Sequence, residues 1–450
     1  MNSTGNIVIV GAGLAGVAAA YQLAARRGVP NVTLVDAREP LTLTSAVGTM
    51  GYRNWWPGPD DTMCRFVSRS IDLMEEMADE SGNAFRLSRR GYLFATARAD
   101  GVAHLRTTAR AVSAFGMGEL REHEKLGAYT PARPEGYRDA PAGADLLLGD
   151  VARAAFPYLA PETAAVLHVR RAGWMNAVAL GAWMLRRAVG AGVAVVRDRA
   201  DGVEQTGGRV TGVRLASGVR LPCDRLVLAA GPGMPRALRL LGAELPLVLE
   251  PHAKLTFRDP LGAVPRDAPF LIWTDAMELP WSDAERAALG DPRLAESFVG
   301  GVHARPVDGP YGDEAWLIWT YDTTTRDAPD WPPAFDPHHG EILLRGASRM
   351  LPRLTAYFGR GAEGVVDGGY YCKTPENRPV VGPLPVEGAY ALGALSGYGI
   401  MASPAAAELL ADHVTDAPLP DYAAALLPAR YESADYQAQI AEWGRLVGQL

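Results

Sequence analysis

The feature that most constrains this chain is a glycine-rich segment near its N-terminus, IVIVGAGLAG at residues 7–16. The β-branched run predicts a buried parallel strand, Gly11, Gly13 and Gly16 predict a tight turn, and residues 17–27 are typical of a helix. In such a unit the first glycine makes the turn, the second admits the backbone to a pyrophosphate, and the third lets the helix pack on the strand. The segment therefore predicts an α/β unit that binds a dinucleotide.

A second predicted strand, VTLV at residues 32–35, ends in Asp36, twenty residues after Gly16. A carboxylate at this position can accept hydrogen bonds from an adenosine ribose, which favours FAD or NAD over NADP. Ala37 and Arg38 follow directly and belong to the same predicted contact with the nucleotide. At this point FAD and NAD are equally open.

Composition and charge narrow the class of protein. With 450 residues the chain can form two or three domain-sized cores. Its net charge of −7 argues against nucleic acid and anionic membranes as partners, because both attract basic surfaces. No apolar run approaches the roughly 20 residues of a membrane helix, and the first residues lack the pattern of a signal peptide. The three cysteines are widely spaced, so we expect a cytoplasmic protein without disulfides or a bound metal.

Two further segments have the composition of a cofactor site. The stretch at residues 41–54, LTLTSAVGTMGYRN, contains Thr44, Ser45 and Gly51. Small residues allow close backbone approach, and hydroxyls can hydrogen-bond a diphosphate or a ribityl chain. Residues 226–233, LVLAAGPG, predict a buried strand that breaks into a second glycine turn. That turn is a second place for backbone contact with the nucleotide.

The middle of the chain, residues 250–357, differs from both ends. It is rich in tryptophan and tyrosine, and strands are predicted at residues 254–257, 270–273 and 316–321. Their alternating, aromatic-rich pattern favours a mixed or antiparallel sheet over βαβ units. We therefore expect a second domain whose architecture differs from that of the first.

Taken in order, these landmarks resemble the flavoproteins of the D-amino-acid oxidase, sarcosine oxidase and glycine oxidase family. The resemblance covers most of the chain and is most specific near the C-terminus. There, KTPENRPVVGP at residues 373–383 and ALSGYGIMASP at residues 394–404 are similar to the family's T-P-D-x-x-P-x-x-G segment and the S-G-x-G turn before its last helix. The resemblance implies that the dinucleotide is FAD.

The same resemblance implies the domain organisation. We expect an α/β protein, α+β overall, with a Rossmann-like FAD-binding domain and a discontinuous substrate domain built on a mixed or antiparallel sheet. The predicted FAD-binding domain comprises residues 1–88, 150–245 and 360–450. The predicted substrate domain comprises residues 89–149 and 246–359.

In this family the C-terminal glycine turn lies near the flavin pyrimidine, whose O2 takes negative charge on reduction, and a helix N-terminus there stabilises that charge. By the same resemblance, Ala230 and Gly231 line the nucleotide and Ala200 contacts the adenine. The predicted cofactor-binding residues are Gly11, Ala12, Gly13, Leu14, Ala15, Gly16, Asp36, Ala37, Arg38, Thr44, Ser45, Gly51, Ala200, Ala230, Gly231, Gly397, Tyr398, Gly399, Ile400 and Met401.

The chain departs from the family pattern at two positions. Monomeric sarcosine oxidases attach flavin through a cysteine five residues before the Thr-Pro pair, where this chain has Gly369. Cys372 is out of register with that cysteine, so we expect non-covalent FAD. The family's carboxylate-binding lysine falls on Met401, which puts a simple amino-acid carboxylate clamp in doubt.

The resemblance implies oxidation of the C–N bond of an amine or amino acid, with hydride transfer to flavin N5, an imine product, and reoxidation by O2 or another acceptor. The sequence has no second G-x-G-x-x-G between a predicted strand and a predicted helix, as NADPH binding would need, and no G-D segment of the aromatic hydroxylase type near the C-terminus, which disfavours a monooxygenase. Two alternatives stay open. The same fold can oxidise the C–O bond of a 2-hydroxy acid or alcohol, or the protein can bind flavin without catalysis. The sequence leaves the oligomeric state open.

Four polar side chains are candidates for the catalytic site. Arg53 follows the predicted flavin loop and can pair with a substrate carboxylate or form an interdomain ion pair. His252 and Lys254 lie on one face of a predicted strand. If that face meets the flavin, one of them can act as a base or an oxygen-activating cation, and a solvated face is the alternative. Tyr371 can hydrogen-bond the substrate or be a buried structural tyrosine.

Overall fold

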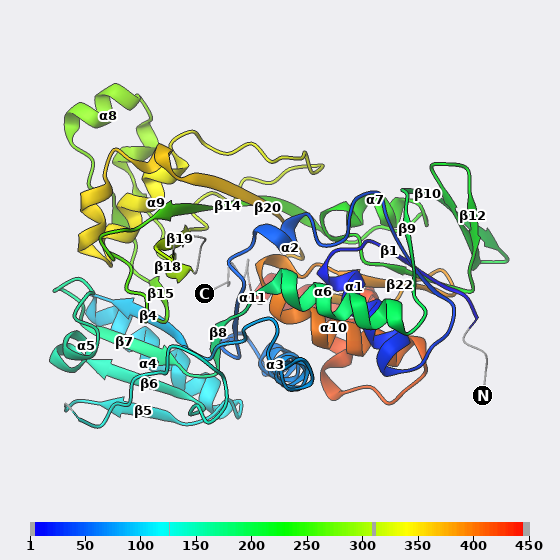
Figure 1. Cartoon of the computed structure of the whole chain (residues 1–450), viewed down its shortest axis with the longest axis horizontal. Helices are drawn as coiled ribbons and strands as arrows, with labels where there is room; N and C mark the ends of the chain where they lie inside the picture. Colours follow the sequence, from blue (N-terminus) through cyan, green and yellow to red (C-terminus); the bar gives the residue numbers. More distant parts are fainter. Residues whose placement is uncertain (1–4, 126, 308–311, 444–450) are drawn as a thin grey trace.

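The computed structural model describes residues 5–125, 127–307 and 312–443. The chain forms two lobes, one around a six-stranded sheet that contains β1 and one around a nine-stranded sheet that contains β4 and β7 (Figure 1). The predicted combination of an α/β unit with a second, mixed or antiparallel sheet is confirmed, and the second sheet is mixed.

The glycine-rich segment lies at the centre of the six-stranded sheet. Its strand β1 pairs in parallel with β13 on one side and with β2 on the other, as predicted. β2 also pairs in parallel with β9, and β13 with β22, whereas β21 runs antiparallel to β22. Across the sheet the strands are β21 Val380–Pro383, β22 Ala389–Gly393, β13 Arg225–Leu228, β1 Ile7–Val10, β2 Val32–Asp36 and β9 Ala194–Arg197.

Alternation along β1 sends its side chains into two cores. Ile7 and Ile9 pack in the core that the helices share, and Val8 packs in the core formed with β10 and β11. Both faces of the strand are covered, which explains why its sequence is apolar at every position. The helices are α1 Leu14–Ala20, its continuation η1 Tyr21–Arg26, α3 Thr62–Ser81, α6 Ala177–Gly190 and α10 Gly399–Val414. The strands over the other face are β10 Ala200–Thr206, β11 Arg209–Leu215 and β12 Arg220–Pro222.

The N-cap that the sequence predicts at Asn176 is confirmed, and the predicted start of another helix is wrong. Asn176 caps α6, and its side chain accepts a hydrogen bond from the backbone N–H of Ala179 at 2.9 Å. The sequence also predicts the last long helix at residues 404–414. It starts instead at Gly399, and Pro404 lies inside it, because the 3-10 turn η6, Ser396–Tyr398, leads directly into the helix.

The nine-stranded sheet forms the core of the second lobe. It is mixed, since β15 pairs in parallel with β4 and antiparallel with β18. Across the sheet the strands are β20 Val365–Lys373, β14 Val248–Arg258, β19 Glu314–Ile318, β18 Val302–Val307, β15 Phe270–Trp273, β4 Tyr92–Thr96, β7 Ala165–Val169, β6 Ala144–Leu148 and β5 Leu120–His123. The longer remaining elements are α4 Ala99–Ala114, α5 Gly149–Ala155, α7 Met234–Arg239, α8 Asp283–Leu289, α9 His339–Ser348 and α11 Ala434–Trp443.

Two strands lie in a different sheet from the one that the predicted boundaries suggest. β7 and β20 fall within the segments expected to form the FAD-binding domain, yet both are strands of the nine-stranded sheet. Long-range pairing decides this, because β7 pairs with β4 and β20 with β14 over large sequence separations. Composition alone does not encode such pairing.

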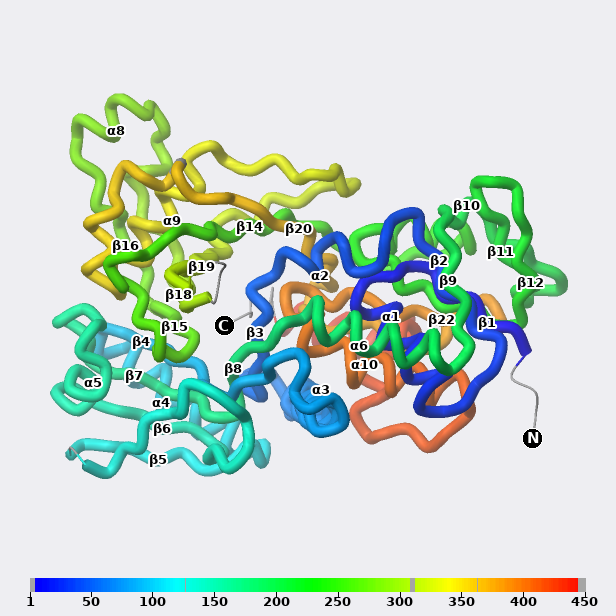
Figure 2. The backbone as a smooth tube through the Cα atoms, viewed as in Figure 1, coloured from blue at the N-terminus to red at the C-terminus, as the bar shows by residue number. Residues whose placement is uncertain are grey.

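Short elements lie at the junction of the two lobes. The two-stranded sheet of β3 Gly51–Arg53 and β8 Ala172–Trp174, together with α2 Thr44–Val47, lies between them (Figure 2). α2 contacts β20, and β3 contacts α10. Within the described residues, no helix is both long and apolar enough to span a membrane. The same residues hold no cluster of three or more His, Cys, Asp or Glu side chains fit to bind a metal.

Candidate functional site

A large cavity runs between the two lobes. It has about 1540 Å³ of empty space, part of it open to solvent. One end, which we call the glycine end, is lined by residues 11–15, Asp36 and Ala230. The other, which we call the aromatic end, is lined by Tyr92, Phe270, His303 and Tyr371 together with Arg53.

The glycine end is shaped by close backbone contacts. Gly11 has φ +112°, and a Cβ there would lie 2.3 Å from the carbonyl oxygen of Ala229. A Cβ at Gly16 would lie 1.8 Å from the carbonyl oxygen of Gly11. Both positions therefore require glycine for the turn and for helix packing, as the fingerprint predicts.

Gly13 differs from these two because the protein leaves space at this position. It has an ordinary backbone conformation with φ −68°, and the nearest atom to an added Cβ is the Ser45 hydroxyl at 3.9 Å. Gly13 also lines the cavity, so a Cβ would project toward it. The fold itself leaves room for a side chain at this position. Glycine here therefore fits a backbone that must approach a pyrophosphate closely.

Asp36 lies at the end of β2 and lines the cavity. Its carboxylate accepts hydrogen bonds from the backbone N–H of Ala12 at 2.7 Å and of Arg38 at 2.9 Å. The two bonds fix the carboxylate beside the glycine turn, and each oxygen keeps a further lone pair for a hydroxyl donor. The carboxylate therefore fits the contact with an adenosine ribose that the sequence predicts here.

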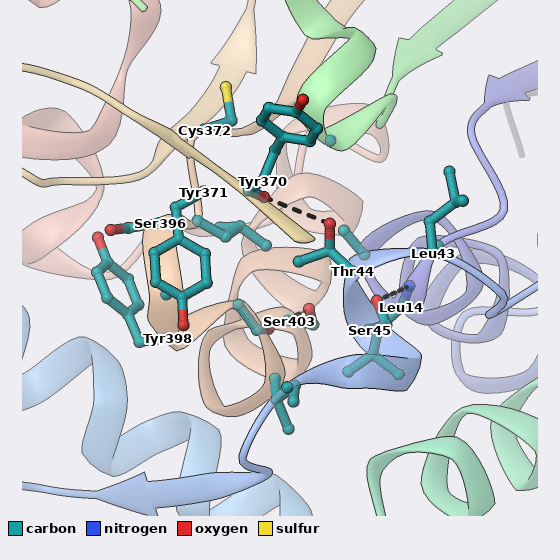
Figure 3. Close-up of a pocket in the computed structure, with 18 of the residues that line it drawn as sticks. Leu14, Leu43, Thr44, Ser45, Tyr370, Tyr371, Cys372, Ser396, Tyr398 and Ser403 are labelled. Carbon is teal, nitrogen blue, oxygen red and sulfur yellow. Dashed lines mark hydrogen bonds between the residues drawn. The ribbon is translucent and has the colours of Figure 1, made fainter. Parts of the chain in front are cut away.

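Two hydroxyl side chains of α2 line the cavity between its ends. The Ser45 hydroxyl accepts a hydrogen bond from the backbone N–H of Leu14 at 3.2 Å, and the Thr44 hydroxyl donates to the carbonyl of Tyr370 at 3.3 Å (Figure 3). Gly369 allows this approach, because a Cβ there would lie 2.8 Å from the Thr44 hydroxyl. Both hydroxyls line the cavity and fit the predicted contact with a diphosphate or ribityl chain.

The C-terminal turn closes the cavity from the side of α10. The Tyr398 hydroxyl donates a 2.6 Å hydrogen bond to the carbonyl of Asn377, which ties the turn to the loop before β21. Met401 is buried, and its sulfur lies 3.3 Å from the backbone nitrogen of Arg53. The start of α10 therefore contacts the strand that carries Arg53, which links the predicted flavin turn to the aromatic end.

Most of the predicted cofactor residues line the cavity, and three do not. Gly16 lies behind the turn against Gly11, Ala37 is exposed, and Ala200 is a buried residue at the start of β10. The predicted residues that line the cavity are Gly11, Ala12, Gly13, Leu14, Ala15, Asp36, Arg38, Thr44, Ser45, Gly51, Ala230, Gly231, Gly397, Tyr398, Gly399, Ile400 and Met401.

Arg53 is the cationic group that β3 brings to the aromatic end. Its side chain is buried, and its guanidinium carbon lies 5.5 Å from the centre of the Tyr92 ring. Burial lowers the pKa of Arg53 while Tyr92 opposes that shift. A guanidinium keeps its charge even so, so the cavity holds a fixed positive charge against an aromatic wall.

Tyr371 lines the aromatic end from β20, and its hydroxyl stays protonated because burial raises the pKa to about 12. Its ring stacks on His252, with centroids 4.2 Å apart. His252 in turn lies 3.1 Å from the carboxylate of Glu250, to which Lys373 donates at 2.6 Å. Burial alone would raise the pKa of Glu250, but hydrogen bonds from His252 and Lys373 lower it to about 2.

His252 and Lys254 lie outside the residues that line the cavity. Lys254 pairs with Asp367 on the neighbouring strand, and its ammonium lies 5.0 Å from the centre of the Trp316 ring. Both side chains therefore already have partners within the nine-stranded sheet. His252 supports Tyr371 from behind, and neither side chain lines the cavity in which a base or an oxygen-activating cation would act.

Sequence reasoning missed three side chains of the aromatic end: Tyr92, Phe270 and His303. Tyr92 and Phe270 are paired residues of neighbouring strands, and their rings are 4.5 Å apart. The His303 ring meets Phe270 edge-on at 5.6 Å. A signal existed in the alternation of each strand, but the pattern does not tell which face of a sheet meets a cofactor.

Comparison with known proteins agrees with this geometry. A family model described as DAO, FAD-dependent oxidoreductase, matches residues 6–413. L-proline dehydrogenase from P. horikoshii has a similar structure, with a TM-score of 0.72 at 18% identity over 95% of this chain and 97% of that one. Iminodiacetate oxidase from Chelativorans sp. gives 0.68 at 20% over 94% and 99%, and glycine oxidase from Bacillus cereus gives 0.66 at 16% over 92% and 95%.

At these identities the structural likeness shows the fold alone. The family match spans nearly the whole chain, from the strand before the glycine turn to the end of α10. The residues at the glycine end also fit FAD on their own geometry. The chain therefore belongs to the DAO family of FAD-dependent oxidoreductases.

Proposed function

We propose that this protein oxidises the C–N bond of an α-amino acid, with the substrate carboxylate held by Arg53. The observation that carries the proposal is a buried guanidinium at the aromatic end of the cavity, on the strand that follows the cofactor loop. A desolvated guanidinium favours a carboxylate partner strongly, because the ion pair is weakly screened there. Bound FAD supplies the redox chemistry by accepting two electrons and a hydrogen from the substrate carbon.

The remaining residues of the aromatic end support an amino acid whose side chain is apolar. Tyr92, Phe270 and Tyr371 present rings to the cavity, and Ile318 of β19 adds an aliphatic contact. Such a wall excludes water and packs against carbon rather than against a second charged group. Arg53 fixes one end of the substrate, so the carbon that carries the nitrogen is held at a set distance from the guanidinium.

We further propose that FAD is bound non-covalently. Gly369 offers no thiol at the position used for covalent attachment in the related sarcosine oxidases. Cys372 lines the cavity, but burial raises the pKa of its thiol to about 12. A thiol in this state is a poor nucleophile at neutral pH.

Anaerobic titration of the purified yellow protein tests the substrate proposal. Amino acids and the 2-hydroxy acids of the same carbon skeleton are added separately while the visible flavin absorbance is followed. Bleaching by an amino acid and not by its hydroxy-acid partner is expected. Bleaching by the hydroxy acid alone would instead indicate oxidation of a C–O bond, and no bleaching by either class would indicate a flavin-binding protein without this activity.

A further inference from the structure

His303 lines the aromatic end of the cavity. It lies on β18, between Ile272 of β15 and Ile318 of β19 in the register of the sheet. Phe270 packs edge-on against its ring, at 5.6 Å and 88°. The imidazole is therefore held on two sides by apolar neighbours while part of its surface faces the cavity.

The hydrogen bond of the ring fixes which nitrogen carries the proton. Nδ1 lies 2.6 Å from the carbonyl oxygen of Gly301, and a carbonyl oxygen can only accept. Nδ1 is therefore the protonated nitrogen, and the neutral ring carries its lone pair on Nε2. Within the part of the chain that the structure describes, Nε2 has no hydrogen-bond partner. A ligand in the cavity can supply one.

The charges around the ring keep it in the neutral form. Burial lowers the pKa of His303 to about 4, the bond to Gly301 opposes this, and the positive charge of Arg53 lowers it further. Arg305, two residues along β18, is a second cation, with its Nε–H donated to the carbonyl of Thr49 at 3.0 Å. Tyr92 of β4 lies beyond Phe270, and the flanking residues of β15 and β19 carry no charge. At neutral pH the ring is thus a free base beside a guanidinium.

We propose that Nε2 of His303 accepts the proton that the substrate ammonium must lose before its C–N bond is oxidised. The inference rests on the proposed function, because it assumes an amino-acid carboxylate on Arg53. In this step an N–H bond of the ammonium breaks, its electron pair stays on the substrate nitrogen, and the proton bonds to Nε2 to give an imidazolium. The amine lone pair that results is what oxidation of the neighbouring C–N bond requires.

Substrate binding and proton acceptance are coupled in this arrangement. A carboxylate on Arg53 neutralises the charge that opposes protonation of His303, so binding raises the proton affinity of the ring. A zwitterionic α-amino acid thus supplies both the proton and the charge that makes its acceptance favourable. An amine without a carboxylate brings no negative charge to Arg53, and we expect it to be a poorer substrate.

The variant His303→Asn distinguishes the roles of the two ring nitrogens. The asparagine amide can still donate to Gly301, but it offers no base in place of Nε2. With an amino acid that bleaches the wild-type flavin, we expect the saturating anaerobic rate of bleaching at pH 7 to fall about 100-fold. The rate should recover toward wild type at about pH 10, where the substrate amine loses its proton to solvent. His104→Gln, at an exposed site on α4, is the matched control and should match wild type at both pH values.

A second readout does not depend on turnover. Histidine-labelled holoprotein is titrated by NMR with and without acetate, and His303 is assigned from the signal missing in His303→Asn. We expect the pKa of His303 to lie well below that of free histidine and to rise when acetate binds. Acetate should bind His303→Asn as tightly as wild type, because Arg53 is intact.

Several outcomes would overturn the inference. A wild-type rate in the variant at pH 7, an equal deficit at both pH values, or a His303 signal that ignores acetate would each do so. If His303→Asn does not fold, His303→Gln replaces it in the same measurements. If no amino acid bleaches the wild-type flavin, the proposed function itself has failed and the role of His303 fails with it. If an amino acid bleaches the wild-type flavin but the variant does not behave as predicted, only the role of His303 is refuted.

Discussion

The glycine end and the aromatic end of one cavity are built in different ways. At the glycine end, the backbone forms the cavity surface because side chains are absent or small, and residues 11–15 come from one continuous turn. At the aromatic end, side chains form the cavity surface. They belong to four different strands and are Arg53, Tyr92, Phe270 and His303. The backbone surface suits a cofactor common to a family, and the side-chain surface suits a ligand that differs between its members.

The difference also concerns how each end is stabilised. Steric contacts hold the glycine turn, such as the close approach of Gly11 to Ala229. A buried polar network supports the aromatic end, in which Glu250 joins Lys373 and His252 behind Tyr371. Steric contacts do not depend on pH, whereas a buried carboxylate network does. The two ends should therefore respond to different perturbations.

The largest effect is expected when two glycines of the turn are replaced by alanine, each in a separate variant. Gly11→Ala forces a Cβ against Ala229 at a φ of +112°, and should lower the Tm by about 5 °C or more with loss of bound FAD. Gly13→Ala meets no protein atom closer than 3.9 Å. It should leave the Tm of the FAD-free protein within about 1 °C of wild type while weakening FAD at least about tenfold. Thermal unfolding and FAD titration of the two variants decide this, and an equal loss of Tm in both would contradict it.

The next largest effect is on the free energy of unfolding at acid pH. The Glu250 carboxyl has a pKa of about 2 against an ordinary value of 4.5. Because the folded value is depressed, its stabilising contribution is complete above about pH 4.5 and is lost as the pH falls toward 2, a change of about 3 kcal/mol. Glu250→Gln should flatten the decline of the unfolding free energy across this window and lower stability at pH 7. Glu432→Gln, at an exposed site, is the control, and an acid profile of Glu250→Gln that coincides with it would refute the assignment.

A smaller effect, on the KM, distinguishes Arg53, a cation that lines the cavity, from Lys254, a cation outside it. Arg53→Ala should raise the KM for a carboxylate substrate at least about tenfold, or about 1.4 kcal/mol, because the substrate loses its charged partner. Lys254→Met, which removes a buried cation paired with Asp367 outside the cavity, should leave the KM near the wild-type value. Steady-state kinetics over a range of substrate concentrations measure both. An unchanged KM in Arg53→Ala would remove Arg53 from the substrate site.

The smallest effect is expected for the cavity thiol. Acid precipitation of the wild-type protein should release the flavin into the supernatant, and Cys372→Ser should behave in the same way. Both follow from non-covalent binding and from the raised pKa of the Cys372 thiol. Flavin that stays with the wild-type pellet and leaves with the supernatant of Cys372→Ser would show a covalent bond to this sulfur.

Prediction from the sequence succeeded where the signal is local. The turn at residues 11–16 has its strand before it and its helix after it in one short segment, so spacing alone carries the information. It was less complete where a residue depends on distant partners. Ala200 lies outside the cavity lining, and β7 and β20 joined the other sheet through pairings far along the chain.

The sequence by itself predicted a dinucleotide-binding turn and a second domain on a mixed or antiparallel sheet, and its resemblance to a known family implied FAD. Only the tertiary structure decided which side chains face the cofactor cavity. His252 and His303 show the reason. Both are histidines on strands of the same sheet, yet one is stacked behind Tyr371 and the other lines the cavity. Alternation fixes the two faces of a strand, but only the packing of one lobe against the other decides which face meets the cavity.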